Sequence, residues 1–163
     1  MRLMGKKTRD GKTDMAELLI LVGTESGNAE MVAEKLRDDL GLVGYQVEIK
    51  TDFSDVERVF VDRELVLVCC ATRGSGDLPD NILPLKMHLD AVPQYLGHIR
   101  YGVIALGDQS YDETFCGGGK LLDETLADLG ATRIGERLEI DACSEQAPDE
   151  VALAWCRDWV TQL

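Results

Sequence analysis

Short apolar runs alternate along the chain with longer segments in which apolar residues recur every three or four positions. Residues 18–22 and 65–70 are continuously apolar, and residues 102–106 are nearly so. Such runs are typical of strands that are covered on both faces, as in a parallel sheet. Weaker runs at 45–49 and 133–140 predict two further strands. The pattern therefore predicts five strands in all.

The segments between these strands carry a helical period. Residues 28–40 place apolar side chains at i, i+4 and i+8. Residues 148–160 do the same and begin with a proline, which is favoured in the first turn of a helix. Segments 82–89 and 120–129 predict two more helices, the second ended by Gly130. Strands that alternate with helices predict an α/β fold with a doubly wound parallel sheet.

Three of the predicted strands run into polar, glycine-rich loops. These loops begin at Gly23, Ala71 and Leu106. Parallel strands end at the same edge of a sheet, and ligands of doubly wound folds bind at the carboxyl ends of the strands. The three loops are therefore expected to meet and to form one ligand site.

The first loop has the composition of an anion site. Thr24, Ser26 and Asn28 offer donors, Gly27 allows close approach of the backbone, and a helix begins there. No Lys or Arg occurs between Gly23 and residue 34, so the loop is not that of a nucleotide triphosphatase. A plain capped helix, with Ser26 or Asn28 as N-cap, accounts for the same residues. Both interpretations stay open at this point.

The second and third loops could enclose a flat ring. Gly74 and Gly76 permit unusual backbone conformations in the second loop, and Tyr111 in the third could lay an aromatic face on a heterocycle. A plain turn and a structural tyrosine are the alternatives. A phosphate cradle beside two such loops suits flavin mononucleotide (FMN).

Charge and length narrow the class of protein. The chain has 163 residues, which suits one domain, and a net charge of −13. An acidic surface disfavours nucleic acid and anionic membrane as partners and favours a basic protein. No apolar run approaches the roughly 20 residues that a membrane helix needs, so we expect a cytoplasmic protein. Residues 1–14 hold five basic side chains without apolar periodicity and predict a disordered tail, or a basic docking arm.

The cysteines and histidines suggest no metal site. Five cysteines occur without Cys-x-x-Cys spacing, which predicts buried thiols rather than a zinc site or a disulfide framework. His88 and His98 lack the spacing of metal ligands.

At the three loops the chain resembles a known family. Segments 24–29, 71–77 and 106–112 are similar to the three FMN-binding loops of flavodoxins, and the resemblance extends from residue 18 to the C-terminus. It implies one flavodoxin-like FMN-binding domain over residues 15–163, with strand order 2-1-3-4-5.

Smaller segments indicate a subgroup. Residues 76–81 and 115–117 resemble the small MioC-type flavodoxins. Residues 26–29 and 106–108 resemble the flavodoxin-like domain of sulfite and cytochrome P450 reductases, which is the near second.

The resemblance also implies which residues bind FMN. The first loop holds the phosphate, Thr72, Arg73 and Gly74 border the ring, and Tyr111 stacks on its other face. The implied cofactor-binding residues are Thr24, Glu25, Ser26, Gly27, Asn28, Ala29, Ala71, Thr72, Arg73, Gly74, Ser75, Gly76, Leu106, Gly107, Asp108, Tyr111, Phe115 and Cys116.

Arg73 departs from the family pattern, in which many members carry an aromatic residue or histidine. A guanidinium can also stack on a ring, and its charge would favour a reduced, anionic flavin.

The resemblance implies an electron carrier rather than an enzyme. The expected role is one-electron transfer from a flavodoxin- or ferredoxin-type NAD(P)H reductase to acceptor proteins with basic surfaces. The alternatives are an NAD(P)H-dependent quinone or nitro reductase, for which no nicotinamide-binding segment is evident, and a fragment of a diflavin reductase. A phospho-receiver domain is disfavoured, because no acidic residues end the strands at 18–22 and 65–70.

Overall fold

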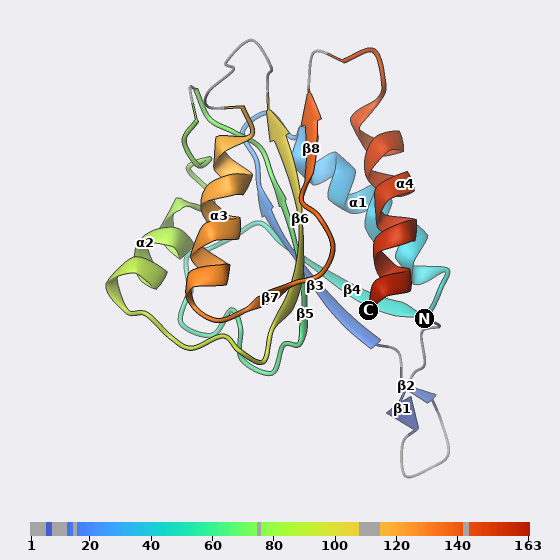
Figure 1. Ribbon diagram of the computed structural model, residues 1–163, viewed down its shortest axis with the longest axis horizontal. Coiled ribbons are helices and arrows are strands. Elements are labelled where there is room, and N and C mark those ends of the chain that lie inside the picture. Colours follow the sequence, from blue (N-terminus) through green and yellow to red (C-terminus); the bar gives the residue numbers. More distant parts are fainter. Residues whose placement is uncertain (1–5, 8–12, 15, 75, 108–114, 142–143) are drawn as a thin grey trace.

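The fold is a single parallel sheet between two layers of helices (Figure 1). The computed structural model describes residues 6–7, 13–14, 16–74, 76–107, 115–141 and 144–163.

The sheet has the strand order that the resemblance implied. The strands run in the order β4-β3-β5-β6, and two short segments, β7 and β8, occupy the fifth position beside β6. Every pair in this sheet is parallel. With the fifth position counted as one strand, the predicted order 2-1-3-4-5 is confirmed. The strands are β3 (Ala16–Gly23), β4 (Tyr45–Lys50), β5 (Leu65–Cys70), β6 (Arg100–Gly107), β7 (Thr132–Arg133) and β8 (Leu138–Asp141).

The prediction of one continuous strand over 133–140 was wrong. Thr132 of β7 pairs with Arg100, an offset of 32 residues, whereas Leu138 of β8 pairs with Ile104, an offset of 34. Two extra residues therefore leave the ladder between β7 and β8. The carbonyl of Ile134 lies in this excursion and accepts a hydrogen bond from the Trp159 indole at 3.0 Å. The strand is thus interrupted where the C-terminal helix is hydrogen-bonded to it.

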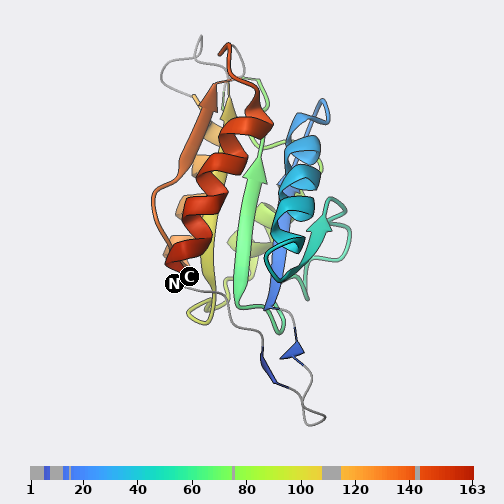
Figure 2. The same ribbon diagram turned by 90° about the vertical axis from the view of Figure 1, so that its right-hand side faces the viewer.

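The helices cover both faces of the sheet. Helices α1 and α4 lie on one face and α2 and α3 on the other, and Figure 2 shows α1 and α4 side by side. None of the helices in the described residues is long and apolar enough to cross a membrane. The helices are α1 (Asn28–Gly41), α2 (Leu83–Ala91), α3 (Gly117–Asp128) and α4 (Pro148–Trp159), followed by a 3-10 turn, Val160–Gln162.

Two apolar clusters hold these layers together. In β5, Val66 and Val68 pack into the cluster under α2 and α3, and Leu65 and Leu67 into the one under α1 and α4. All six residues of β5 are buried. This is the burial expected of a central strand, and it fixes the edge of the sheet at which the loops emerge.

Part of the predicted tail is described as well. Lys6–Lys7 (β1) and Thr13–Asp14 (β2) pair as a two-stranded antiparallel sheet that projects away from the main sheet. The predicted disorder of residues 1–14 as a whole stays a prediction.

Trp159 anchors the C-terminal helix to the sheet through Gly102 of β6. Trp159 is 1% exposed. A Cβ on Gly102 would lie 2.6 Å from the Trp159 ring, so the position has no room for a side chain. Trp155 stacks on Trp159 with ring centroids 5.6 Å apart.

We expect Gly102→Ala to lower the free energy of unfolding by about 1–3 kcal/mol, because the added methyl group overpacks the contact with Trp159. Urea denaturation followed by circular dichroism measures this change. Gly41→Ala is the matched control, since a Cβ at Gly41 would meet nothing within 4 Å. Equal unfolding midpoints for Gly102→Ala and the unmodified protein would contradict the expected clash.

Candidate functional site

The loops after β3, β5 and β6 emerge at the carboxyl edge of the sheet, at the top of Figure 1. Residue 75 and residues 108–114 are outside the part that the structure describes. The predicted site residues Ser75, Asp108 and Tyr111 therefore lie outside the described residues. The other members of the predicted set are placed as follows.

The first loop leads into a helix that has no side-chain cap. Gly27 is the N-cap of α1, with a left-handed φ of 89°, and no side chain caps the helix start. The Gly27 N–H donates to Thr24 Oγ1 at 3.0 Å, and the Met31 N–H donates to the Gly27 carbonyl at 2.9 Å. The alternative in which Ser26 or Asn28 caps the helix is therefore wrong.

The absence of a side-chain cap leaves the first loop available to a ligand. Glu25, Ser26, Gly27 and Asn28 are exposed, whereas Ala29 is fully buried and can offer only its backbone. The first N–H groups of a helix point outward and attract an anion. Ser26 and Asn28 add neutral donors beside them.

The second loop is a closed hairpin. The Arg73 N–H donates to the Asp77 carbonyl at 2.7 Å, and the Asp77 N–H donates back to the Arg73 carbonyl at 2.9 Å. Gly74 and Gly76 within it have positive φ values of 53° and 132°. A Cβ on Gly74 would meet nothing within 4 Å, and Gly74 is exposed.

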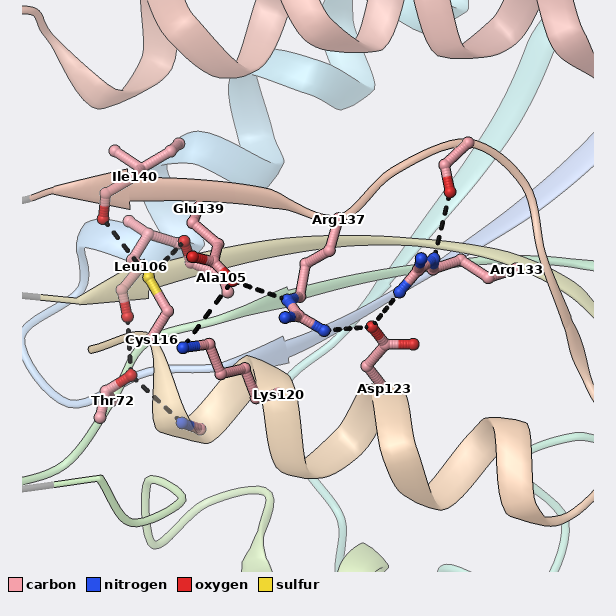
Figure 3. Close-up of polar contacts among 12 residues, drawn as sticks. Thr72, Ala105, Leu106, Cys116, Lys120, Asp123, Arg133, Arg137, Glu139 and Ile140 are labelled. Atoms are coloured by element: carbon pink, nitrogen blue, oxygen red, sulfur yellow. Dashed lines mark hydrogen bonds and ion pairs between the residues drawn. The ribbon is translucent and has the colours of Figure 1, made fainter. Parts of the chain in front are cut away.

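Thr72 joins the second loop to the third. Its hydroxyl donates to the Leu106 carbonyl at 2.8 Å and accepts from the Gly118 N–H at 3.2 Å (Figure 3). Both roles of the hydroxyl are thus used within the protein. Thr72 shapes the site by holding its neighbours, and its hydroxyl has no proton left to donate to a ligand.

Helix α3 begins three residues earlier than predicted because it packs on the backbone of the second loop. A Cβ on Gly117 would lie 2.6 Å from the Gly76 carbonyl oxygen, and one on Gly118 would strike the Ala71 carbonyl oxygen. Glycines here allow the loop and the helix start to touch.

Two of the predicted third-loop residues have buried side chains. Leu106 is 4% exposed and Cys116 is fully buried. The Cys116 thiol donates to the Ala105 carbonyl at 3.3 Å, and burial raises the pKa of this thiol to about 12 (Figure 3). Either residue could contact a ligand only through its backbone. Gly107 and Phe115, at the ends of the same loop, are partly exposed.

Asn81 links the first and second loops, and the sequence analysis did not include it among the site residues. Its side-chain oxygen accepts from the Thr24 N–H at 2.9 Å. Its amide group donates to the carbonyls of Val22 at 2.8 Å and Thr51 at 3.0 Å. One side chain thus satisfies three backbone groups at the ends of β3 and β4. Nothing in the local pattern around residue 81 indicates these distant partners.

Arg73 is paired with two carboxylates. Its Nη1 lies 2.6 Å from Asp80 Oδ1, and its Nε lies 3.4 Å from Glu25 Oε1. Glu25 belongs to the first loop and Asp80 to the second. The pairing also brings a basic side chain beside the first loop, which contains none of its own.

Comparison with known proteins assigns the family. The flavodoxin family model matches residues 20–155. The chain is 40% identical over 149 residues to flavodoxin YqcA of Escherichia coli, covering 91% of this chain and 99% of that protein. A solved structure of a mutant flavodoxin from Pseudomonas aeruginosa superimposes with a TM-score of 0.80 at 34% identity, covering 90% of this chain and 98% of that one.

The chain belongs to the flavodoxin family.

Within the flavodoxins, both predicted subgroups are found among the relatives. MioC of Escherichia coli is 34% identical over 91% of this chain and 99% of its own length. The flavoprotein α-component of sulfite reductase from Vibrio parahaemolyticus is 40% identical over 82% of this chain, which corresponds to 22% of that protein. MioC is thus matched over nearly its whole length, whereas the reductase component is matched over one part of its length.

Members of the flavodoxin family bind FMN, and the residues of this chain fit that group. An uncapped helix start with exposed Ser26 and Asn28 supplies neutral donors for a phosphate. The exposed backbone at Gly74 lies on the same edge and leaves room for a ring.

A buried carboxylate on helix α3 is the centre of a hydrogen-bond network that joins this helix to the sheet. Asp123 of α3 is 4% exposed. It accepts a hydrogen bond from the Tyr101 hydroxyl at 2.7 Å. It also accepts from the guanidinium groups of Arg133 and Arg137 at 2.6 Å each (Figure 3). Arg137 also pairs with Glu139 at 3.0 Å. The network ties α3, whose first turn touches the second loop, to β6, β7 and β8.

The same network makes stability depend on pH. Burial raises the pKa of Asp123, but the hydrogen bonds from Tyr101, Arg137 and Arg133 outweigh it, and the pKa ends below its ordinary value. The carboxylate therefore stabilises the fold fully above the unfolded pKa of about 3.9, and this contribution is lost as the pH falls through the folded value.

We expect Asp123→Asn to lower the free energy of unfolding by about 2 kcal/mol or more at neutral pH, since it removes the buried charge to which both guanidinium groups donate. The difference from the unmodified protein should begin to shrink below about pH 4, where Asp123 of the unfolded chain takes up a proton, and should be lost as the pH falls through the lower folded value. Chemical denaturation across pH measures both effects. Asp128→Asn, on the exposed end of the same helix, is the control. A loss that stays constant down to low pH would contradict the assignment.

We expect Asn81→Ala to lower the free energy of unfolding by about 1–3 kcal/mol, because it leaves the three partly buried backbone groups without partners. Gln46→Ala removes an exposed amide from β4 and serves as the control. Thermal and urea unfolding compare the two variants. Equal stability of both would show that the Asn81 bonds do not hold the loops.

Proposed function

We propose that this chain binds FMN at the three loops and carries electrons one at a time between a reductase and acceptor proteins. The observation that carries the proposal is the uncapped start of α1, at which Ser26 and Asn28 are exposed on the edge shared by the three loops. Bound FMN supplies the redox chemistry, since its ring accepts electrons singly. Electron carriage is the role of the flavodoxin family.

The first loop is proposed to hold the phosphate. Thr24, Ser26 and Asn28 offer side-chain donors, and the N–H groups of the first turn of α1 add the positive end of the helix dipole. Gly27 allows the phosphate to approach the backbone, and Ala29 contributes its N–H. The Glu25 side chain does not take part, because a carboxylate would repel the phosphate.

The second and third loops are proposed to border the ring. The backbone of residues 71–76 lies along one side, and the open surroundings of Gly74 allow its peptide to turn over, so that its carbonyl can accept a hydrogen bond from a protonated ring nitrogen. Residues 106–116 border the other side, with Tyr111 in the stacking role that the resemblance implied.

The proposed partners are proteins with basic surfaces. The net charge of −13 attracts such partners and repels nucleic acid and anionic membranes. A flavodoxin- or ferredoxin-type NAD(P)H reductase would supply the electrons. Charge-guided docking should weaken as salt is added.

The likeness to one part of sulfite reductase favours a second candidate, in which this chain performs the same transfer as a domain of a larger reductase.

An assay of NAD(P)H oxidation by the purified chain tests the remaining alternative, a quinone or nitro reductase. A carrier consumes NAD(P)H only after a separate reductase is added, whereas unaided turnover would identify an NAD(P)H-dependent quinone or nitro reductase.

We expect the apoprotein to quench the fluorescence of FMN at a 1:1 ratio and to turn yellow, with a visible flavin spectrum. Asn28→Asp should weaken FMN binding by about tenfold and riboflavin binding much less, because the new carboxylate repels only the phosphate. Gln46→Glu makes the same charge change on exposed β4 and should leave both affinities unchanged.

A chain that neither quenches FMN nor retains its colour would overturn the proposed function. Equal losses of FMN and riboflavin affinity in Asn28→Asp would instead show that the first loop does not bind the phosphate.

A further inference from the structure

Arg73 connects the first loop to the second. Its backbone is held on both sides by the hairpin bonds to Asp77, so the direction of its side chain is set by a closed loop. The guanidinium then reaches Asp80 within its own loop and Glu25 in the first loop. The first loop thus meets the second at two consecutive residues, Thr24 through Asn81 and Glu25 through Arg73.

The two links differ in kind. The Asn81 link is neutral, partly buried and supported by three hydrogen bonds. The Arg73 link is ionic, and the side chains of Arg73 and Glu25 are 51% and 42% exposed. Salt screens exposed ion pairs and leaves buried neutral hydrogen bonds nearly unchanged. The Arg73 link is therefore the one that can open while the fold stays intact.

We propose that Arg73 is a positioning residue that clasps the first loop to the second and slows the release of FMN. The inference rests on the proposed function. In that function, FMN spans both loops, with the phosphate at the first loop and the ring at the second. Separating these loops is thus a direct route for the cofactor to leave, and the ion pair opposes that separation.

The charges around Arg73 favour this role over a direct contact with the phosphate. The guanidinium already has a short ion pair of 2.6 Å with Asp80, and a second carboxylate lies on its Nε. A phosphate approaching Arg73 would also approach Glu25 and Asp80, which repel it. The positive charge is compensated within the clasp and does not act on the ring as a free cation.

The test measures the rate of FMN release from the loaded protein, followed by the recovery of flavin fluorescence after dilution. We expect Arg73→Met and Glu25→Gln each to release FMN about two- to fivefold faster at low salt, the range of an exposed ion pair. The double variant should release it no faster than either single one, because both remove the same link. Arg73→Lys keeps the charge and should restore part of the slow release.

Salt gives a readout that simple loss of stability would not produce. In about 1 M salt, where the Debye length is about 3 Å, the unmodified protein should release FMN as fast as the variants, and the variants should change little. Arg63→Met is the matched control. It removes another exposed ion pair, the 2.8 Å contact of Arg63 with Glu48, and should not alter FMN release.

Each other outcome would contradict the proposal that Arg73 slows FMN release by linking the two loops. Additive effects of Arg73→Met and Glu25→Gln would show two separate contributions. Faster release from Arg73→Met alone would make Arg73 a direct ligand of FMN. Unchanged release from every variant would show that the link does not retain the cofactor, while the proposed function would still stand. An unmodified protein that takes up no FMN would overturn the proposed function and the clasp together.

Discussion

Backbone groups at the ends of parallel strands need partners, and here two side chains supply them. A strand that ends next to others leaves N–H and C=O groups that are partly buried and cannot be left unpaired without cost. Asn81 satisfies the groups at Val22, Thr24 and Thr51. Thr72 does the same between Leu106 and Gly118. These bonds link the first loop to the second, and the second loop to Leu106 and the first turn of α3.

The rest of the molecule keeps those strand ends in place. Two apolar clusters press the helix pairs onto the sheet, and the buried Asp123 network holds α3 against the strands beside it. The first turn of α3 then touches the second loop directly at Gly117 and Gly118. The packed core thus supports the backbone of the second loop through the first turn of α3.

Much of the architecture could be predicted from the sequence because it depends on burial alone. Residues 65–70 are apolar at every position and form β5, covered on both faces. The loops after three strands could be expected at one edge because parallel strands end together. Two of the failures involve partners distant in the chain. The fifth strand breaks where the Trp159 indole binds the Ile134 carbonyl, and α3 begins early, where its glycines pack on the second loop. The third failure is local, since Gly27 is the N-cap of α1 and its N–H donates to Thr24.

The candidate site residues also divide into those that the local sequence indicates and those that depend on distant partners. Ser26, Asn28 and Gly74 could be selected from local pattern, since their chemistry is visible in the loop itself. Asn81 could not, because its partners are 30 to 59 residues away. The pairing of Arg73 with Glu25 likewise exists only after the loops are brought together.

The central claim is that the loops form a prearranged FMN site at one edge of the sheet. The most direct measurement is a titration of the isotope-labelled apoprotein with FMN, followed by NMR of the backbone amides. The account predicts large shifts at Asn28, Ala29 and Gly74, with small ones at β4 and along the outer surface of α2. Shifts that are largest away from the loops, or spread across the whole core, would contradict it.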